Sequence, residues 1–216
     1  NAVNVLSMDV ISQKFLTFDE FIASTQWMTT GSSSIGHLEF TTIDGKKHRV
    51  KARKNFVLDV CTIEELIRLA RDNRKQVNSV LVKSELGKVR LAVASDMETY
   101  LVMAWLNYLL NGSYRQWQGS TIEEDTSQES DRLIKMLQLC AIAYGLPFDY
   151  KGFEHQPTTE ELKNIIEILI QHARLNVPAE WKSDFDQLME KMLESFDNST
   201  LILFDGKSVH EWLVTG

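Results

Sequence analysis

The chain has 216 residues, of which 44% are hydrophobic and 25% are charged, as expected of a globular protein with a sizeable core. This length suits one large domain or parts of two. Its longest apolar run, residues 100–110, is about half the roughly 20 residues of a membrane-spanning helix, and the net charge of −7 argues against nucleic-acid binding over the whole surface. The chain starts with Asn and ends directly after an apolar run, which favours a piece of a larger protein.

The first half of the chain is predicted to hold a helix followed by strands in pairs. Helical spacing of apolar residues covers positions 1–28, and a loop of small residues follows over 29–36. Strands are expected at 37–43 and 48–52, joined by the turn signal Asp44-Gly45. A capping box then opens a helix over 62–73, and two further strands are expected at 77–82 and 88–94.

The second half is predicted to be mainly helical. The pattern Ser95-x-x-Glu98 indicates a helix through Leu110, and a loop over 119–130 precedes a helix over 131–144. Thr158-x-x-Glu161 opens a helix to about Asn176, and another helix spans 180–196. The last segment reads as a hairpin of 201–204 and 208–214. Helices with short paired strands predict an α+β fold.

Charge is distributed unevenly. Residues 46–90 contain 13 of the 23 Lys and Arg but only five of the 30 Asp and Glu, a local net charge of +8. Such segregation predicts one face of positive potential. The face is either a solvated basic helix and hairpin or a channel for phosphates.

Two basic or small-residue groups are candidate phosphate sites. Exposed amides and hydroxyls of Gly31, Ser32, Ser33 and Ser34 could bind phosphate, although on its own such a segment is more often a linker. Lys88 and Arg90 alternate along a strand, so they share a face, and Lys83 precedes them. Two cations on one face could hold a triphosphate, or they could simply be solvated.

Two carboxylates, Asp149 and Glu154, lie five residues apart between a short apolar run and a helix start. A carboxylate at a strand end is where Mg²⁺ or Mn²⁺ would be held for phosphoryl or nucleotidyl transfer, because these ions prefer oxygen ligands. Asp149 would anchor the ion and Glu154 could reach sugar hydroxyls. The alternative is an ordinary polar turn.

The order of these segments resembles the fingers and palm of viral RNA-dependent RNA polymerases from double-stranded RNA viruses, the reovirus-like and totivirus-like enzymes. Residues 27–34 resemble the template-guiding motif G, residues 83–94 the triphosphate-binding motif F, and residues 149–156 motif A with its leading catalytic Asp. Thr215-Gly216 would stand where motif B begins. The resemblance covers roughly residues 25–216.

The resemblance implies a fold, roles and partners. Residues 1–145 would belong to the fingers and 146–216 to the start of the palm. Asp149 would be the catalytic metal ligand; Lys83, Lys88, Arg90 and Glu154 would bind the nucleotide; residues 31–34 would contact the template. Mg²⁺ or Mn²⁺ would be the cofactor, and RNA template, RNA product and nucleoside triphosphates the partners. Viral capsid proteins are a candidate partner, no membrane is expected, and the location would be the virion interior or the host cytoplasm.

Two departures from the family pattern limit which residue roles the resemblance implies for this chain. Glu154 stands where Asp or Asn is usual, which leaves ribose selection by this residue open. Gly-Asp-Asp, the family's motif C, does not occur in the chain, so its carboxylates would have to follow residue 216. A non-catalytic helical domain that binds RNA or a protein remains the alternative, as does another nucleotidyltransferase without a template loop.

Overall fold

The computed structural model describes residues 14–72, 75–85, 88–111, 121, 124–145, 158–204 and 207–214, and only the backbone at 85, 88 and 89. About half of these residues are helical and about a quarter lie in strands. Within these ranges no helix is both long enough and apolar enough to cross a bilayer.

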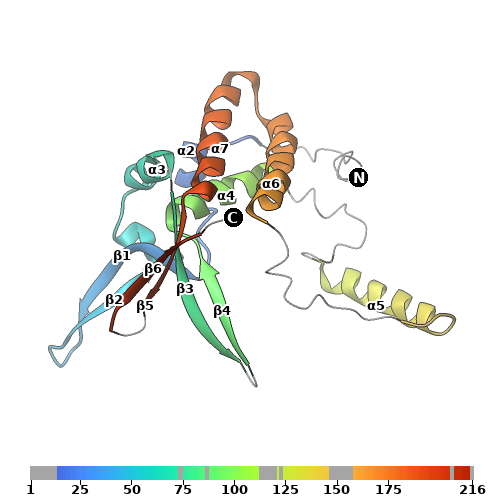
Figure 1. The fold of residues 1–216 in the computed structure, drawn as a ribbon, viewed down its shortest axis with the longest axis horizontal. Helices are drawn as coiled ribbons and strands as arrows, with labels where there is room; N and C mark the ends of the chain where they lie inside the picture. Colours follow the sequence, from blue (N-terminus) through green and yellow to red (C-terminus); the bar gives the residue numbers. More distant parts are fainter. Residues whose placement is uncertain are drawn as a thin grey trace.

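Helices α2, α3, α4, α6 and α7 form one layer in which α4 is the central element, whereas α5 lies apart from it, as Figure 1 shows. Helix α4 is buried on several sides, which is typical of a helix surrounded by others. The helices are α2 (Phe18–Ala23), α3 (Ile63–Asp72), α4 (Met97–Leu110), α5 (Thr126–Cys140), α6 (Thr159–Ala173) and α7 (Lys182–Asp197), with the short 3₁₀ segments η1 (Lys54–Asp59), η4 (Arg174–Asn176) and η5 (Ala179–Trp181).

Trp105 of α4 stands at the centre of this core, where its side chain is only 1% exposed. Its ring makes edge contacts with Phe18 of α2 and Phe185 of α7, at centroid distances of 5.5 and 5.6 Å. The indole Nε1 donates a 3.0 Å hydrogen bond to the carbonyl of Leu16, so its polar atom is satisfied. One aromatic side chain thus joins three helices distant in sequence.

We expect Trp105→Ala to lower the free energy of unfolding by about 3–5 kcal/mol, since it removes a large buried side chain and leaves a cavity. Urea unfolding measures the change. Trp181→Ala is the matched control, because Trp181 is 41% exposed and should cost about 1 kcal/mol or less. Equal losses for the two variants would contradict the proposed core.

The strands form a two-stranded hairpin and a four-stranded sheet, both on the same side of the helical layer (Figure 1). The hairpin pairs β1 (Ser32–Thr41) with β2 (Lys47–Arg53). The sheet has the order β4-β3-β5-β6, with β3 (Gln76–Glu85), β4 (Lys88–Ala94), β5 (Ser199–Phe204) and β6 (Val209–Leu213). Strands β3 and β5 are parallel, whereas β3–β4 and β5–β6 are antiparallel. Segments from both predicted regions, 1–145 and 146–216, therefore share one sheet.

The predicted loop over 29–36 is wrong in part, because β1 already begins at Ser32. A register shift between Ser32 and His37 lets the strand continue through Gly36, whose φ of +69° favours glycine. A Cβ at Gly36 would also stand only 2.6 Å from a methyl carbon of Val60. Strand pairing therefore overrides the composition of small residues, which on its own is typical of a loop.

Two predicted helix starts are also wrong. Helix α5 begins at Thr126 rather than 131, because Asp125 and Gln128 form a capping box within the segment read as a loop. Asp96, not Ser95, caps α4 and accepts a hydrogen bond from the amide of Thr99. The polar first turn of a helix resembles a loop in composition, which explains the first error.

Candidate nucleotide and RNA-binding site

The β3–β4 hairpin brings two of the predicted triphosphate ligands together. The antiparallel register pairs Lys83 directly with Arg90, and Glu85 with Lys88. Directly opposed residues have Cβ atoms about 4.5–5.5 Å apart and point to the same face. Both Lys83 and Arg90 are exposed. Two cations on one face are a suitable pair of ligands for an anion such as a triphosphate.

Lys88 shares the face of Arg90, because the two residues are separated by one position along β4. Lys88 stands closer to the end of the hairpin, opposite Glu85. The backbone of the hairpin therefore places all three predicted cations on one face. In Figure 1 the β3–β4 hairpin projects away from the helices, so this face is presented outside the helical core.

Asp149 and Glu154 lie outside the described residues, and their roles stay predictions. The segment that carries them leads into α6, whose first turn is capped by Thr158 and Glu161 as predicted. No group of three or more His, Cys, Asp or Glu that could hold a metal ion occurs in the part of the chain that the structure describes.

Two of the four predicted template-binding residues, Ser33 and Ser34, make hydrogen bonds within the fold. Ser33 is 3% exposed, and its hydroxyl accepts a 2.9 Å hydrogen bond from the amide of Ile35. The hydroxyl of Ser34 accepts a 2.7 Å hydrogen bond from the amide of Met97, at the start of α4. Gly31 and Ser32 are exposed, and these two residues are therefore better placed to contact a template than Ser33.

Asp96 was not predicted as an important residue from the sequence. It lies between the β3–β4 hairpin and the segment 31–34, the two candidate binding regions. Its carboxylate, in a side chain 6% exposed, accepts hydrogen bonds from the amides of Val77 (2.6 Å) and Thr99 (2.8 Å). Strand β3, the end of β4 and α4 thus meet at Asp96, next to the bond between Ser34 and Met97. An Asp directly before an apolar helix was the available signal.

Glu98 faces the same junction with a carboxyl group that is half buried. Burial raises the pKa of Glu98 above its ordinary value of 4.5, and the negative charge of Asp96 raises it further, while hydrogen bonds to nearby amides and to Ser34 oppose the shift. The folded state therefore disfavours the charged form of Glu98.

We expect Glu98→Gln to stabilise the protein at neutral pH and to have little effect in acid. Because the folded pKa is raised, the wild-type protein loses stability relative to the variant as pH rises from below 4.5 through the raised pKa. Free energies of unfolding measured for both proteins between about pH 3.5 and pH 8 test this. A difference that stays constant over that range would refute the burial of the charge.

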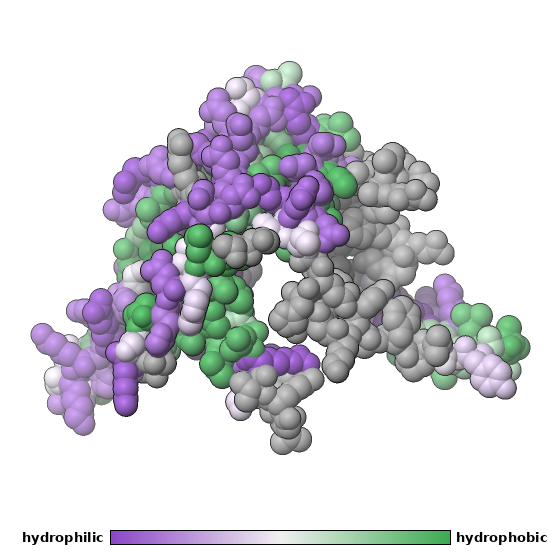
Figure 2. All heavy atoms as spheres, viewed as in Figure 1, coloured by the Kyte–Doolittle hydropathy of each residue, from purple (hydrophilic) through white to green (hydrophobic). Residues whose placement is uncertain are grey.

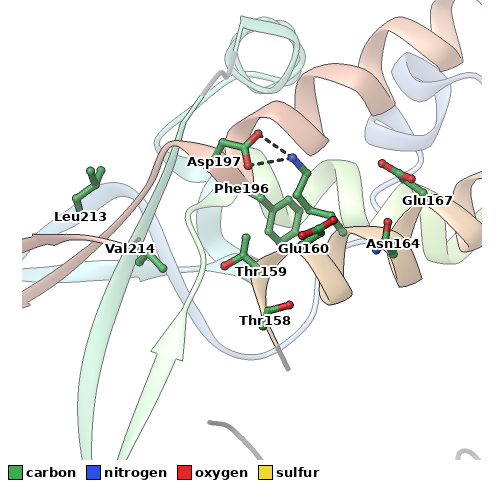
Figure 3. Close-up of a pocket in the computed structure, with 10 residues that line it drawn as sticks. Thr158, Thr159, Glu160, Asn164, Glu167, Phe196, Asp197, Leu213 and Val214 are labelled. Atoms are coloured by element: carbon green, nitrogen blue, oxygen red, sulfur yellow. Dashed lines mark hydrogen bonds and ion pairs between the residues drawn. The ribbon is translucent and has the colours of Figure 1, made fainter. Parts of the chain in front are cut away.

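A cavity of about 790 Å³ lies between the start of α6 and the end of β6 (Figure 3). Among the described residues of its lining, Lys163 is the only Lys or Arg, and its Nζ lies 2.7 Å from the carboxylate of Asp197. Glu160 and Glu167 add further negative charge. The described lining is therefore acidic, and it does not by itself attract a triphosphate.

The comparisons with known proteins agree with the resemblance at a coarse level. No protein-family profile matches the chain. The chain is 23% identical over 194 residues to the probable RNA-directed RNA polymerase of Giardia lamblia virus (isolate Wang). This alignment covers 88% of the chain but 10% of that viral protein, so the chain spans about a tenth of its length. The chain is thus distantly similar to a segment of a protein named as a viral RNA-directed RNA polymerase.

Proposed function

We propose that the chain is the fingers and the start of the palm of a template-directed RNA polymerase, with residues 1–145 and 146–216 as the two parts. The observation that carries the proposal is the pairing of Lys83 with Arg90 on one face of a projecting hairpin, in a chain similar to a viral polymerase. A cationic pair on one face of a β-hairpin is a suitable ligand for the phosphates of a nucleotide.

The proposed reaction is nucleotidyl transfer. The 3′ hydroxyl of the growing RNA attacks the α-phosphate of a nucleoside triphosphate, a new phosphodiester bond forms, and pyrophosphate leaves. Lys83, Lys88 and Arg90 would bind the triphosphate, and Asp149 would hold Mg²⁺ or Mn²⁺ together with carboxylates from outside the chain. Such an ion neutralises charge on the phosphate oxygens. Glu154 could reach the ribose hydroxyls in this proposal.

Exposed apolar side chains on the four-stranded sheet support its place in a larger protein. Val82, Leu91 and Val93 are 61%, 68% and 58% exposed. The register pairs Val82 with Leu91 and Val80 with Val93, so they lie on one face. Figure 2 shows hydrophobic residues gathered over this sheet. An exposed apolar patch of this kind is typical of a surface that further polypeptide covers.

The partners follow from the reaction. RNA template, RNA product and nucleoside triphosphates would bind, viral capsid proteins are a candidate partner, and synthesis would take place in the virion interior or the host cytoplasm. Gly31 and Ser32, at the start of β1, would contact the template.

Nucleotide incorporation by the intact protein tests the proposal. We expect radiolabelled nucleotide to enter acid-insoluble product only when RNA template and Mg²⁺ or Mn²⁺ are both present. RNA binding without incorporation under either ion would instead support the non-catalytic RNA-binding alternative. Nucleotide incorporation that does not depend on added RNA template would support the alternative of another nucleotidyltransferase.

A further inference from the structure

The β1–β2 hairpin has two chemically different faces. On β2, Lys47, Arg49, Lys51 and Arg53 alternate with other residues and therefore share one face. On the opposite face the register pairs Phe40 with His48 and Leu38 with Val50. The ribbon thus combines a cationic face and a face with aromatic and aliphatic side chains.

Phe40 and His48 form a stacked pair across the hairpin. Their ring centroids are 5.4 Å apart and their planes differ by 16°. Phe40 is nevertheless 49% exposed, and His48 is exposed as well. A cross-strand stack that leaves so much ring surface in solvent can accept a further planar group.

One groove on the hairpin contains both cationic and aromatic side chains. Although the two sets belong to opposite faces of the ribbon, this groove of about 420 Å³ is lined by members of both. Phe40 and His48 come from one face and Lys47 and Arg49 from the other, together with Glu39 and Thr41. Arg49 lies 3.7 Å from the carboxylate of Glu39. Glu39 therefore compensates part of the charge of Arg49, while Lys47 supplies positive charge beside the stacking surface.

The hairpin retains an excess of positive charge. Lys46 pairs with Asp44 at 3.2 Å, and the ammonium of Lys54 lies over the ring of Tyr100. By contrast, the described residues offer no ion-pair partner to Lys47, Lys51 and Arg53. Figure 2 shows the hairpin as a hydrophilic projection.

We propose that the β1–β2 hairpin is a binding surface for single-stranded RNA, with bases stacking on Phe40 and His48 and phosphates held by Lys47 and Arg49, the two cations that line the same groove. Stacking requires unpaired bases, whose faces are free, and repeated cations match the repeated charge of a phosphodiester chain. The inference rests on the proposed function in that the bound strand is the template. Binding itself is measurable without synthesis.

Fluorescence anisotropy with the intact protein and a labelled single-stranded oligoribonucleotide tests this surface. We expect Phe40→Ala to raise the Kd roughly tenfold through loss of base stacking. Phe40→Tyr retains the ring and should stay within about twofold of wild type. The matched control is Phe56→Ala in η1, because Phe56 is 45% exposed and lies outside the groove; its Kd should also change by less than about twofold.

The salt dependence separates stacking from charge. Lys47→Ala should lower the slope of log Kd against log salt concentration by about 0.7, whereas Phe40→Ala should leave the slope unchanged. No binding of single-stranded RNA by the wild-type protein, or equal Kd values for Phe40→Ala and wild type, would overturn the proposal. Equal binding of an acidic polypeptide would also overturn it, because it would show a surface for acidic proteins.

The two proposals fail in different ways. Phe40-dependent RNA binding by a protein that incorporates no nucleotide refutes the polymerase and keeps the RNA surface. Normal templated incorporation together with unchanged binding by Phe40→Ala refutes the RNA surface alone.

Discussion

We expect Asp149→Ala to lower nucleotide incorporation by the intact protein by about a thousandfold or more, equivalent to about 4 kcal/mol in activation free energy. The reason is the loss of a carboxylate proposed to hold Mg²⁺ or Mn²⁺ beside the reacting phosphate. Single-stranded RNA binding should change by less than about twofold, because the proposed RNA contacts lie on the β1–β2 hairpin and at the start of β1. Incorporation and anisotropy are measured on the same preparations.

The control for this variant is Asp131→Ala. Asp131 is exposed on α5, a helix in which no residue is buried, so its replacement should leave incorporation within about twofold of wild type. Wild-type incorporation by Asp149→Ala would refute the metal role. Loss of both RNA binding and incorporation would show that the replacement disturbs the fold instead of the chemistry.

The second large effect concerns the cationic pair on β3 and β4. Lys83→Ala and Arg90→Ala should each lower kcat/KM for the nucleotide by roughly 30- to 1000-fold, corresponding to about 2–4 kcal/mol, with a raised KM. Lys88→Ala should act in the same direction. Steady-state kinetics with varied triphosphate concentration give these values. Arg90→Lys should recover part of the loss, because lysine keeps the charge but not the bidentate geometry.

Stability measurements separate binding from folding in these variants. Lys83 and Arg90 are exposed, so each replacement should change the free energy of unfolding by less than about 0.5 kcal/mol. Lys135→Ala on the exposed face of α5 is the control for loss of a cation. An unchanged KM in Arg90→Ala and Lys83→Ala would show that the triphosphate binds elsewhere.

Local signals in the sequence predicted much of the fold. The capping boxes at Thr62 and Thr158 form as expected, since their hydrogen bonds join residues only three positions apart. Strand β4 has the predicted bounds, and the hairpin of β5 and β6 follows from two apolar runs separated by a turn signal.

Contacts between segments far apart in the sequence could not be predicted from such local patterns. The parallel pairing of β3 with β5 joins residues more than a hundred positions apart, and no local pattern specifies it. The register that sets Lys83 opposite Arg90 was also missed, because β3 was predicted to end at position 82 and it extends to Glu85. The alternation of residues along β4 was enough to predict that Lys88 and Arg90 share a face. That Lys83 lies on this face as well follows only from its cross-strand pairing with Arg90.

A structure of the intact protein with template RNA and a non-hydrolysable nucleoside triphosphate would test most directly whether Lys83 and Arg90 bind the triphosphate opposite Asp149. We expect triphosphate oxygens within about 4 Å of the side-chain nitrogens of Lys83 and Arg90, in a cleft whose opposite wall carries Asp149. A triphosphate bound away from the β3–β4 hairpin, or Arg90 and Asp149 on opposite faces of the protein, would contradict this expectation.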